Sequence, residues 1–498
     1  MKHRGLITLS VMGASIMSAL DTTIANVALP HIQGSLSSTQ EQMAWVLTSY
    51  IVATAIMTPL CGWLAGRIGR RRVFLASVLG FTLTSALCGL AQSLPEIVIA
   101  RTLQGICGAA LVPMSQAVLL DINPPERHAR AMSVWVMGVT LGPIIGPALG
   151  GWLTEVYDWR WVFFINVPVG ALCFLGIAGF MPETTLRKSR FDVFGFAMLS
   201  LAIGSLQMML DRGQTLDWFS STEIRIEAAI AAVALWMFVV HVMTTKHAPF
   251  ITLSMFRDRN FLTGNIFIFV VGVVLFATLA LLPPLLQGLM GYPVVLTGLV
   301  TAPRGFGTLA AMLVLGRLMD RIDARWLIGA GFVMTAISLS MMTGFYLQMP
   351  SDIVVWSGVL QGFGTGFVYV PLAAITFATL APQLRNEGTA VFSLVRNIGS
   401  SIGISAVVAL LTRNTQILHS RLAEHITPFG DALNPGTSML LPGSSLAAVN
   451  AAVTRQASML AYNNDFKLML WLTVVTMPLI VLLRPAARRS SEPAPVME

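Results

Sequence analysis

Fourteen long apolar stretches run along this chain of 498 residues, and they restrict its possible folds more than any other feature. An α-helix needs about 20 apolar residues to span the hydrocarbon core of a bilayer. Only 11% of the residues are charged, whereas soluble domains average about 25%. This charged fraction is too small for a water-soluble enzyme. The sequence predicts an all-α polytopic membrane protein with spans near residues 6–28, 44–65, 73–92, 96–119, 131–153, 161–181, 191–210, 226–245, 262–286, 296–318, 326–347, 353–378, 390–412 and 466–484.

The 31 Lys and Arg residues predict the orientation of these spans. With a cytoplasmic amino terminus, 21 of them fall on the inner side, seven on the outer side and three within spans. This asymmetry follows the positive-inside rule, so both termini are predicted to be cytoplasmic. The Lys-His-Arg start could alternatively belong to a signal peptide, but Asp21 inside the first apolar run favours an uncleaved span. The net charge of +8 therefore indicates topology, and we expect no nucleic-acid partner.

The cysteines and the loops give no sign of catalytic or metal chemistry. Cys61, Cys88, Cys107 and Cys173 all lie in apolar stretches, which is typical of small core residues rather than of disulfides or zinc ligands. The loops contain no nucleotide-binding glycine loop, metal cluster or nucleophile–base pair. We therefore expect no enzyme activity, no metal and no cofactor.

The chain contains weak copies of itself, which predict two six-span halves separated by an extra pair of spans. Parallel halves of this kind are typical of transporters, whose substrate site lies between the halves near the membrane midplane. We predict an N-terminal six-helix bundle over 1–183, a central inserted pair with linkers over 184–258, and a C-terminal six-helix bundle over 259–498. The repeated features are Gln104-Gly105 with Gln361-Gly362, Gly142 and Gly146 with Gly399 and Gly403, and residues 62–67 with 316–321.

Charged residues inside the spans are the main functional candidates, because a charge in lipid needs a partner or an aqueous cavity. Asp21 lies about seven residues, or roughly 10 Å, from the outer end of span 1, and Arg101 reaches a similar depth in span 4. We expect the two to interact. Desolvation favours the neutral acid, and a nearby arginine favours the carboxylate, which suits proton coupling. A static ion pair is the alternative.

Arg304 and Arg396 are the other two cations within spans. Each could line the transport cavity, or its long side chain could extend to the membrane interface. We expect six polar residues of the spans to line the substrate cavity between the halves: Asp21, Asn26, Gln104, Gln361, Arg396 and Asn397.

Span 5 has a glycine at every fourth position, which places four glycines on one helix face. Such a face lets another helix approach at backbone distance. Prolines beside it remove backbone hydrogen bonds and permit bending. Tight packing is one interpretation, and a hinge between the halves is the other. The residues are Gly138, Gly142, Pro143, Gly146, Pro147 and Gly150.

Several of these segments resemble signatures of the major facilitator superfamily, in particular its fourteen-span drug/proton antiporters of the EmrB/QacA type. Residues 20–30 (LDTTIANVALP) are similar to the span-1 signature, and residues 101–105 (RTLQG) resemble the span-4 motif, whose arginine is implicated in proton transfer. Residues 138–151 resemble the span-5 motif of exporters, and residues 159–168 also match the family. The resemblance covers nearly the whole chain. It implies two six-helix bundles that transport by alternating access, driven by the proton-motive force.

The loop after span 2 departs from the family pattern. The pattern is Gly-x-Leu-Ala-Asp-Arg-x-Gly-Arg-Arg, and here Gly66 replaces its aspartate. In the family that acid latches the loop to a neighbouring helix, so a conventional latch is not expected in this half. The second copy keeps Asp320 and Arg321. The other motif positions are Gly62, Arg67, Gly69, Arg70 and Arg71.

The longest predicted external loop covers residues 413–465. Leu418, Leu422 and Ile426 recur every four residues, and residues 445–463 are predicted to form a helix that continues into span 14. The loop could be a lid on the protein's own outer face. The family resemblance instead implies a docking surface for a periplasmic adaptor and an outer-membrane channel.

These observations predict a proton-coupled exporter of hydrophobic or amphipathic compounds in the bacterial inner membrane. A cavity lined with Met, Phe and Trp would give loose selectivity. The alternatives are a dedicated exporter of one natural compound, such as a siderophore, fatty acid or antibiotic, and a non-transporting receptor or scaffold. Buried charges argue against a scaffold, which gains nothing from them.

Overall fold

The computed structural model describes residues 4–38, 40–124, 127–183, 191–213, 215–245, 251–319, 321–381, 384–425 and 446–484. Every regular element in these ranges is a helix, as the sequence predicts. The elements are α1 (Arg4–Ser35), α2 (Gln40–Ile68), α3 (Arg70–Leu90), α4 (Leu94–Gly108), α5 (Leu111–Ile122), α6 (His128–Val156), α7 (Trp161–Phe164), α8 (Asn166–Phe180), α9 (Val193–Arg212), η2 (Trp218–Ser220), α10 (Thr222–Thr244), η3 (Leu253–Arg257), α11 (Arg259–Pro284), η4 (Leu285–Leu289), α12 (Val294–Thr301), α13 (Pro303–Leu318), α14 (Ala324–Met342), α15 (Ser351–Ala378), α16 (Arg385–Ala423), α17 (Leu446–Thr476) and η6 (Met477–Leu482).

Proline breaks three spans that the sequence predicts as continuous. α4 and α5 are separated at residues 109–110, α7 and α8 at Ile165, and α12 and α13 at Ala302. Pro113, Pro168 and Pro303 follow these points, and each lacks the N–H that would bond the carbonyl four residues earlier. Lipid-facing backbone must stay hydrogen-bonded, but helices packed inside a bundle tolerate such interruptions.

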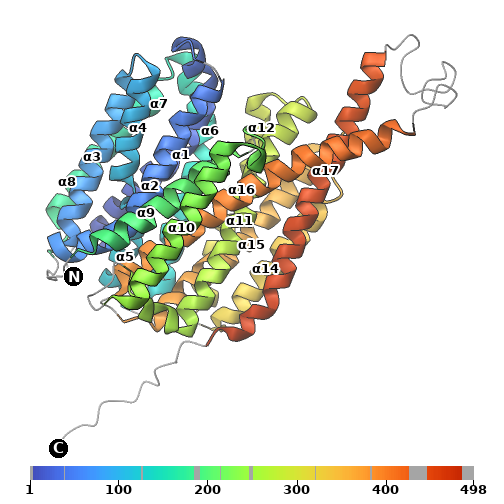
Figure 1. Ribbon diagram of the computed structural model, residues 1–498. Helices are drawn as coiled ribbons and strands as arrows, with labels where there is room; N and C mark the ends of the chain where they lie inside the picture. Colours follow the sequence, from blue (N-terminus) through green and yellow to red (C-terminus); the bar gives the residue numbers. More distant parts are fainter. Residues whose placement is uncertain are drawn as a thin grey trace, which may run out of the picture.

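Two bundles lie side by side in Figure 1, with α9 and α10 in front of them. α1, α3, α4, α5, α6 and α8 pack among themselves, and so do α11, α13, α14, α15, α16 and α17. α2 packs on α4 and also meets α16 of the second bundle, while α13 and α15 of the second bundle contact α6. α9 packs against both α2 and α16, so the inserted pair bridges the bundles. The domain boundaries at residues 183 and 258 stay a prediction.

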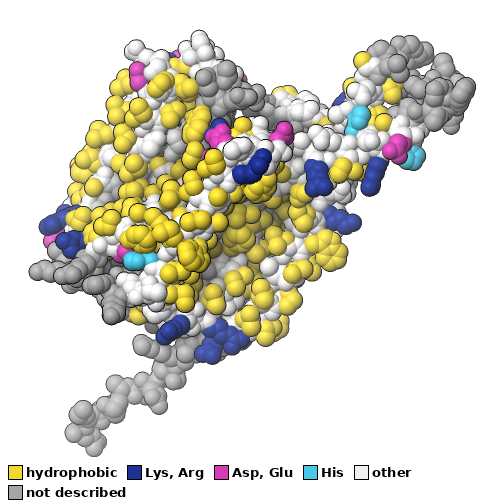
Figure 2. Space-filling model, viewed as in Figure 1, with side chains coloured by type: hydrophobic (Ala, Val, Ile, Leu, Met, Phe, Trp, Pro, Cys, Tyr) yellow, Lys and Arg dark blue, Asp and Glu magenta, His cyan; other side chains and the backbone are white. Residues whose placement is uncertain are grey.

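Thirteen helices in the described part of the chain are long and apolar enough to cross a membrane. The remaining predicted span, 131–153, forms the middle of α6. Figure 2 shows hydrophobic side chains over the sides of both bundles, with Lys and Arg at the lower end and also at the upper end and along the projecting helices. The start of α1 and the end of η6 lie at the lower end (Figure 1), which agrees with two termini on the inner side.

The glycine face of α6 lies directly against α1. A Cβ atom added at Gly142 would lie 2.8 Å from the backbone nitrogen of Leu20, and one at Gly146 would lie 2.2 Å from Thr23 Oγ1. Gly138 faces Met12 and Gly150 faces Ile24 in the same way. The predicted close helix approach is therefore present. The side chains of Pro143 and Pro147 lie outside the described residues, and a hinge role for this face stays a prediction.

The same arrangement recurs in the second bundle, as the internal repeat implies. Cβ atoms added at Gly399 and Gly403 of α16 would meet Phe269 and Val273 of α11 at 2.4 and 2.8 Å. α16 thus packs on α11 as α6 packs on α1. The two halves share one packing scheme at these positions.

The outer ends of α16 and α17 project together beyond the rest of the molecule (Figure 1). His419 Nε2 and Asn450 Oδ1 lie 2.9 Å apart and link the two helices. Arg455 donates to the carbonyl of Leu289 over 3.2 Å, which ties the base of this projecting pair to the second bundle. The helix predicted over residues 445–463, leading into span 14, is present in the described part of the chain as the start of α17 at Leu446. Ile426 of the predicted amphipathic pattern lies outside the described residues.

Candidate functional site

Asp21 and Arg101 form an ion pair inside the first bundle. Arg101 Nη1 donates to Asp21 Oδ2 over 2.7 Å, and the two side chains are 1% and 0% exposed. α1 carries the acid and α4 carries the base, and these elements place them at the similar depth that the sequence predicts. Their interaction is as predicted, and their role in proton coupling stays a prediction.

Two amides complete the coordination of the carboxylate. Gln104 Nε2 and Asn166 Nδ2 each donate to Asp21 Oδ1 over 2.9 Å. Arg101 Nη1 also donates to Gln104 Oε1 over 2.8 Å, so Gln104 bridges the ion pair. Asn166 is held in turn by donating to Ser85 Oγ over 3.0 Å. Asp21 thus accepts three hydrogen bonds from side chains of α4 and α8.

Aromatic rings and a backbone carbonyl enclose the guanidinium of Arg101. Its Cζ atom lies 4.5 Å from the ring centroid of Tyr50 and 5.6 Å from that of Phe163. Its Nε donates to the carbonyl of Val46 over 3.2 Å. Both charges are therefore shielded from water by their own neighbours. Removing one partner of such a pair typically costs about 3–5 kcal/mol, because the other charge stays buried.

A second polar network joins the two bundles. Gln116 of α5 and Arg396 of α16 both donate to the hydroxyl of Tyr369 on α15, over 3.0 and 3.2 Å. The ring of Trp135 on α6 stacks on Tyr369 with centroids 6.4 Å apart. Arg396 thus points into the interface between the bundles and not toward the membrane surface. Arg396 also lies 3.5 Å from the side-chain oxygen of its neighbour Asn397.

The second bundle carries its own buried polar residues near the place that corresponds to the Asp21 cluster. Gln361 Nε2 donates to Thr278 Oγ1 over 3.0 Å. Arg304 is 8% exposed, and among the described residues its hydrogen-bond partner is the carbonyl of Leu275, at 3.5 Å. Arg304 therefore lies inside the protein instead of extending to the membrane interface. The remaining predicted cavity residue, Asn26, lies in α1, and its side chain is outside the described residues.

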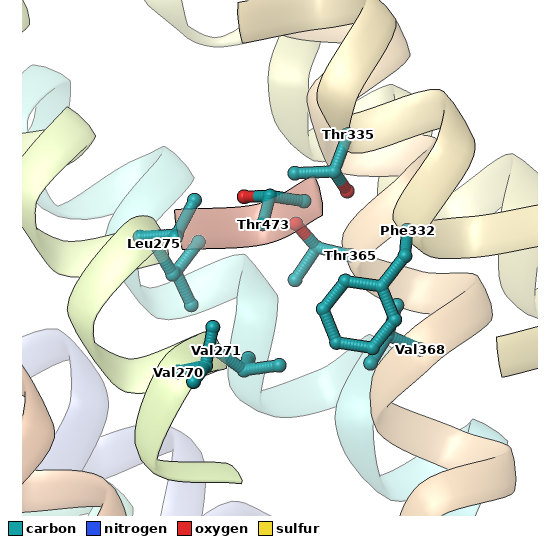
Figure 3. A pocket seen from close by; sticks show the side chains of 9 residues that line it. Val270, Val271, Leu275, Phe332, Thr335, Thr365, Val368 and Thr473 are labelled. Atoms are coloured by element: carbon teal, nitrogen blue, oxygen red, sulfur yellow. The ribbon is translucent and has the colours of Figure 1, made fainter. Parts of the chain in front are cut away.

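A small cavity lies inside the second bundle, between α11, α14, α15 and α17 (Figure 3). Its volume is about 20 Å³, which is enough for one water molecule. Thr335, Thr365 and Thr473 surround it among apolar side chains. Each of these hydroxyls donates to its own helix backbone, so each keeps a free acceptor for a water. This cavity is too small for a substrate.

The loop motif forms the sharp turn between α2 and α3. Gly69 lies between the end of α2 and the start of α3 and has a φ of 99°, which residues with a Cβ atom rarely adopt. A Cβ at Gly66 would meet nothing within 4 Å, so the missing aspartate leaves open space. Gly62 borders a small cleft between α2, α5 and α16. Arg67 stacks over the ring of Trp63 at 5.7 Å, and Arg71 donates to the carbonyl of Ala178.

Asp121, which the sequence analysis missed, links the inner ends of the two bundles. It is the penultimate residue of α5, and Arg70 at the start of α3 donates to it. Arg385, at the start of α16, lies 3.8 Å from the same carboxylate. Asp121 therefore connects the two halves on the side where Gly66 lacks its acid. Of the second copy of the motif, Arg321 is exposed, and Asp320 lies outside the described residues.

The chain is similar to known proteins in both sequence and structure. The family model for the Major Facilitator Superfamily matches residues 11–404. The fatty acid resistance protein FarB of Neisseria gonorrhoeae is 36% identical over 486 residues, which cover 96% of each chain. The multidrug export protein EmrB of Escherichia coli K12 is 35% identical over 492 residues, covering 96% of this chain and 95% of that protein.

Solved structures share the fold at low sequence identity. The human organic anion transporter MFSD10 superposes with a TM-score of 0.60 at 14% identity, covering 95% of this chain and all of that one. The proton:xylose symporter XylE superposes with a TM-score of 0.61 at 14% identity, covering 96% of this chain and 98% of that one.

Proposed function

Since the chain belongs to the Major Facilitator Superfamily, we propose that it is a multidrug efflux transporter that exports hydrophobic or amphipathic compounds from the bacterial cytoplasm in exchange for protons. The observation that carries the coupling mechanism is the buried Asp21–Arg101 pair. The similarity to EmrB and FarB over nearly the whole chain supports export across the inner membrane.

Asp21 would alternate between two states. While it is ionised, Arg101, Gln104 and Asn166 hold it, and the pair is neutral as a whole. A proton that reaches Asp21 from outside would release Arg101 and uncover a charge within the first bundle. Because a buried unpaired charge is costly, the bundle would rearrange to pair or hydrate the arginine. Deprotonation on the inner side would restore the original packing.

The test is transport by everted membrane vesicles with an imposed pH gradient. We expect the wild type to accumulate cationic dyes and other amphiphiles, and a protonophore to abolish this accumulation. Asp21→Asn, which keeps the shape but removes the charge, should lose gradient-driven accumulation at normal expression. Asp352→Asn is the matched control, because Asp352 is an exposed acid in the first turn of α15. Full gradient-driven transport by Asp21→Asn would contradict the coupling role.

A dedicated exporter of fatty acids is the second candidate function. It is favoured by the similarity to FarB, whose name describes fatty acid resistance. A substrate panel in a host that lacks its own pumps separates the two. Protection against many unrelated compounds supports multidrug export, and protection against fatty acids alone supports the dedicated exporter.

We also propose that the projecting ends of α16 and α17 bind a periplasmic adaptor protein, which would connect the transporter to an outer-membrane channel. The support is geometric, since these helix ends extend beyond the bundles (Figure 1). Copurification of the adaptor with the wild type, and its loss when residues 417–450 are replaced by a short linker, would be the expected result. An adaptor that copurifies equally with the shortened protein contradicts this surface.

A further inference from the structure

Arg304 is a buried cation without an acidic partner among the described residues. Its side chain starts on α13 and ends at the carbonyl of Leu275 on α11, at the 3.5 Å limit of a hydrogen bond. Its Nη1 atom is enclosed and has no hydrogen-bond partner in the described part of the chain. A guanidinium stays protonated in proteins, so it cannot avoid this cost by losing its charge.

The internal repeat explains which partner is missing. At the offset of 257, Gln104 of α4 corresponds to Gln361 of α15, and the side chain that accepts from this glutamine is Asp21 in the first bundle and Thr278 in the second. The two glutamines make the same contact, because Gln104 donates to Asp21 over 2.9 Å and Gln361 donates to Thr278 over 3.0 Å. The second bundle therefore has a hydroxyl where the first has its carboxylate.

The guanidinium is also supplied from a different helix. Arg101 corresponds to Gly358, which leaves space at this point of α15. A Cβ at Gly358 would lie 3.6 Å from the Cβ of Arg304, so the arginine of α13 enters beside this glycine. The second bundle thus contains a glutamine and an arginine, as the first bundle does, but no acid in the corresponding place.

The position of Arg304 suits a transported ligand. It lies eight residues from Leu296, where the span begins, which is roughly 12 Å below the outer surface and close to the midplane. α13 packs against α6 of the first bundle, so Arg304 belongs to a helix at the interface of the halves. Substrates of such transporters bind near the midplane at this interface.

We propose that Arg304 binds the carboxylate of anionic amphipathic substrates, which supplies the acid that position 278 lacks. The planar guanidinium matches a carboxylate with two parallel hydrogen bonds, and the pair is neutral in the low-dielectric interior. This inference rests on the proposed export function and adds a substrate class to it. Cationic and neutral amphiphiles would be bound without Arg304.

Binding of three probes with the same twelve-carbon chain tests the proposal on the purified full-length protein in nanodiscs. The probes are laurate, dodecanol and dodecyltrimethylammonium, and the readout is the change in intrinsic tryptophan fluorescence. We expect the wild type to bind laurate about tenfold or more tightly than dodecanol, which corresponds to ~1.4 kcal/mol. Arg304→Gln should remove this preference and leave binding of the cation unchanged. Equal laurate preference in Arg304→Gln and the wild type would overturn the proposal.

Two further variants separate charge from folding. Arg317→Gln removes an exposed arginine of the same helix and should keep the preference for laurate. Thr278→Asp introduces a carboxylate like that of the first bundle. This carboxylate should pair with Arg304 and abolish laurate binding, whereas Thr278→Asn should still bind laurate. If Thr278→Asp and Thr278→Asn bind laurate equally, the carboxylate is not bound by Arg304.

Two further measurements, chloride competition and transport, separate failure of the Arg304 proposal from failure of the proposed function. In the binding buffer, gluconate is replaced by chloride at the same concentration. If chloride displaces laurate from the wild type, the site holds a small anion, and the substrate assignment is wrong. In proteoliposomes, Arg304→Gln should lose laurate export and retain export of the cationic probe. If the wild type exports none of the probes, the proposed function is contradicted. The role of Arg304 is still tested in that case, because the preference for laurate is measured by binding.

Discussion

Asp21 is the residue to which the proposed function assigns proton coupling, and its surroundings determine how it could act. Three donors hold the carboxylate, and no part of its surface is exposed. A proton can therefore reach it only after Arg101 or one of the amides has moved. In the proposed mechanism, protonation would therefore be linked to a rearrangement of α1, α4 and α8, which is the physical requirement for coupling a proton to a conformational change.

Arg101→Lys tests whether the geometry of the pair matters beyond its charge. Lysine keeps the positive charge but donates from one nitrogen, whereas Arg101 bonds Asp21 and Gln104 through Nη1 and the Val46 carbonyl through Nε. We expect normal expression with transport rates reduced about tenfold or more, which corresponds to ~1.4 kcal/mol. Initial rates in everted vesicles measure this, with Arg325→Lys at the inner end of α14 as the control. Unchanged rates would mean that a point charge is sufficient.

The sequence could predict the ion pair and the polar residue Gln104, but not the other members of the two buried polar networks. A charge inside an apolar span is conspicuous, so Asp21 and Arg101 stand out, and their depths can be counted from the span ends. Asn166, Gln116 and Tyr369 give no such signal, because neutral polar residues are common in spans. Only the packing of distant helices brings them together. Asp121 was missed because it lies at a span end, where acids are ordinary.

At the scale of secondary-structure elements, the main feature is the close packing of α6 on α1. Its glycines allow backbone contact, and the structure shows no space for a side chain at Gly142 or Gly146. The sequence predicts this face, because glycine spacing is a local pattern. It did not predict the breaks in the spans at Pro113, Pro168 and Pro303, since bundle packing decides whether a proline bends a helix or divides it.

Gly146→Val should force α6 away from α1. The added side chain would overlap Thr23, and overpacking of this kind typically costs about 1–3 kcal/mol. We expect a lower melting temperature in detergent and reduced transport. Gly179→Ala on α8 is the control, because a Cβ there meets nothing within 4 Å. A variant at position 146 that melts and transports like the wild type would show that the two helices separate without cost.

In the proposed mechanism the two halves alternate between two arrangements, and in this structure contacts of α16 with α2 and α5 hold their inner ends together. Asp121 contacts Arg70 of its own half and Arg385 of the other. Cys61 lies near this contact and lines a narrow cleft with Met114 of α5 and Thr389 of α16. Opening of the inner side must separate these helices, so it would break the Asp121–Arg385 contact and expose the thiol of Cys61.

Asp121→Asn should shift the balance toward the arrangement with an open inner side. The Asp121 side chain is 35% exposed, so the contact with Arg385 is worth at most about 1 kcal/mol, or roughly a fivefold shift in the equilibrium. The measurement is the labelling rate of Cys61 by a membrane-permeant maleimide, in a background in which Cys88, Cys107 and Cys173 are alanine. Asp323→Asn is the control, because Asp323 pairs with Arg325 within its own half. We expect labelling to accelerate in Asp121→Asn alone. If both variants label at the wild-type rate, the inner side is held closed by helix packing, and the ion pair between the halves contributes nothing measurable to the alternation.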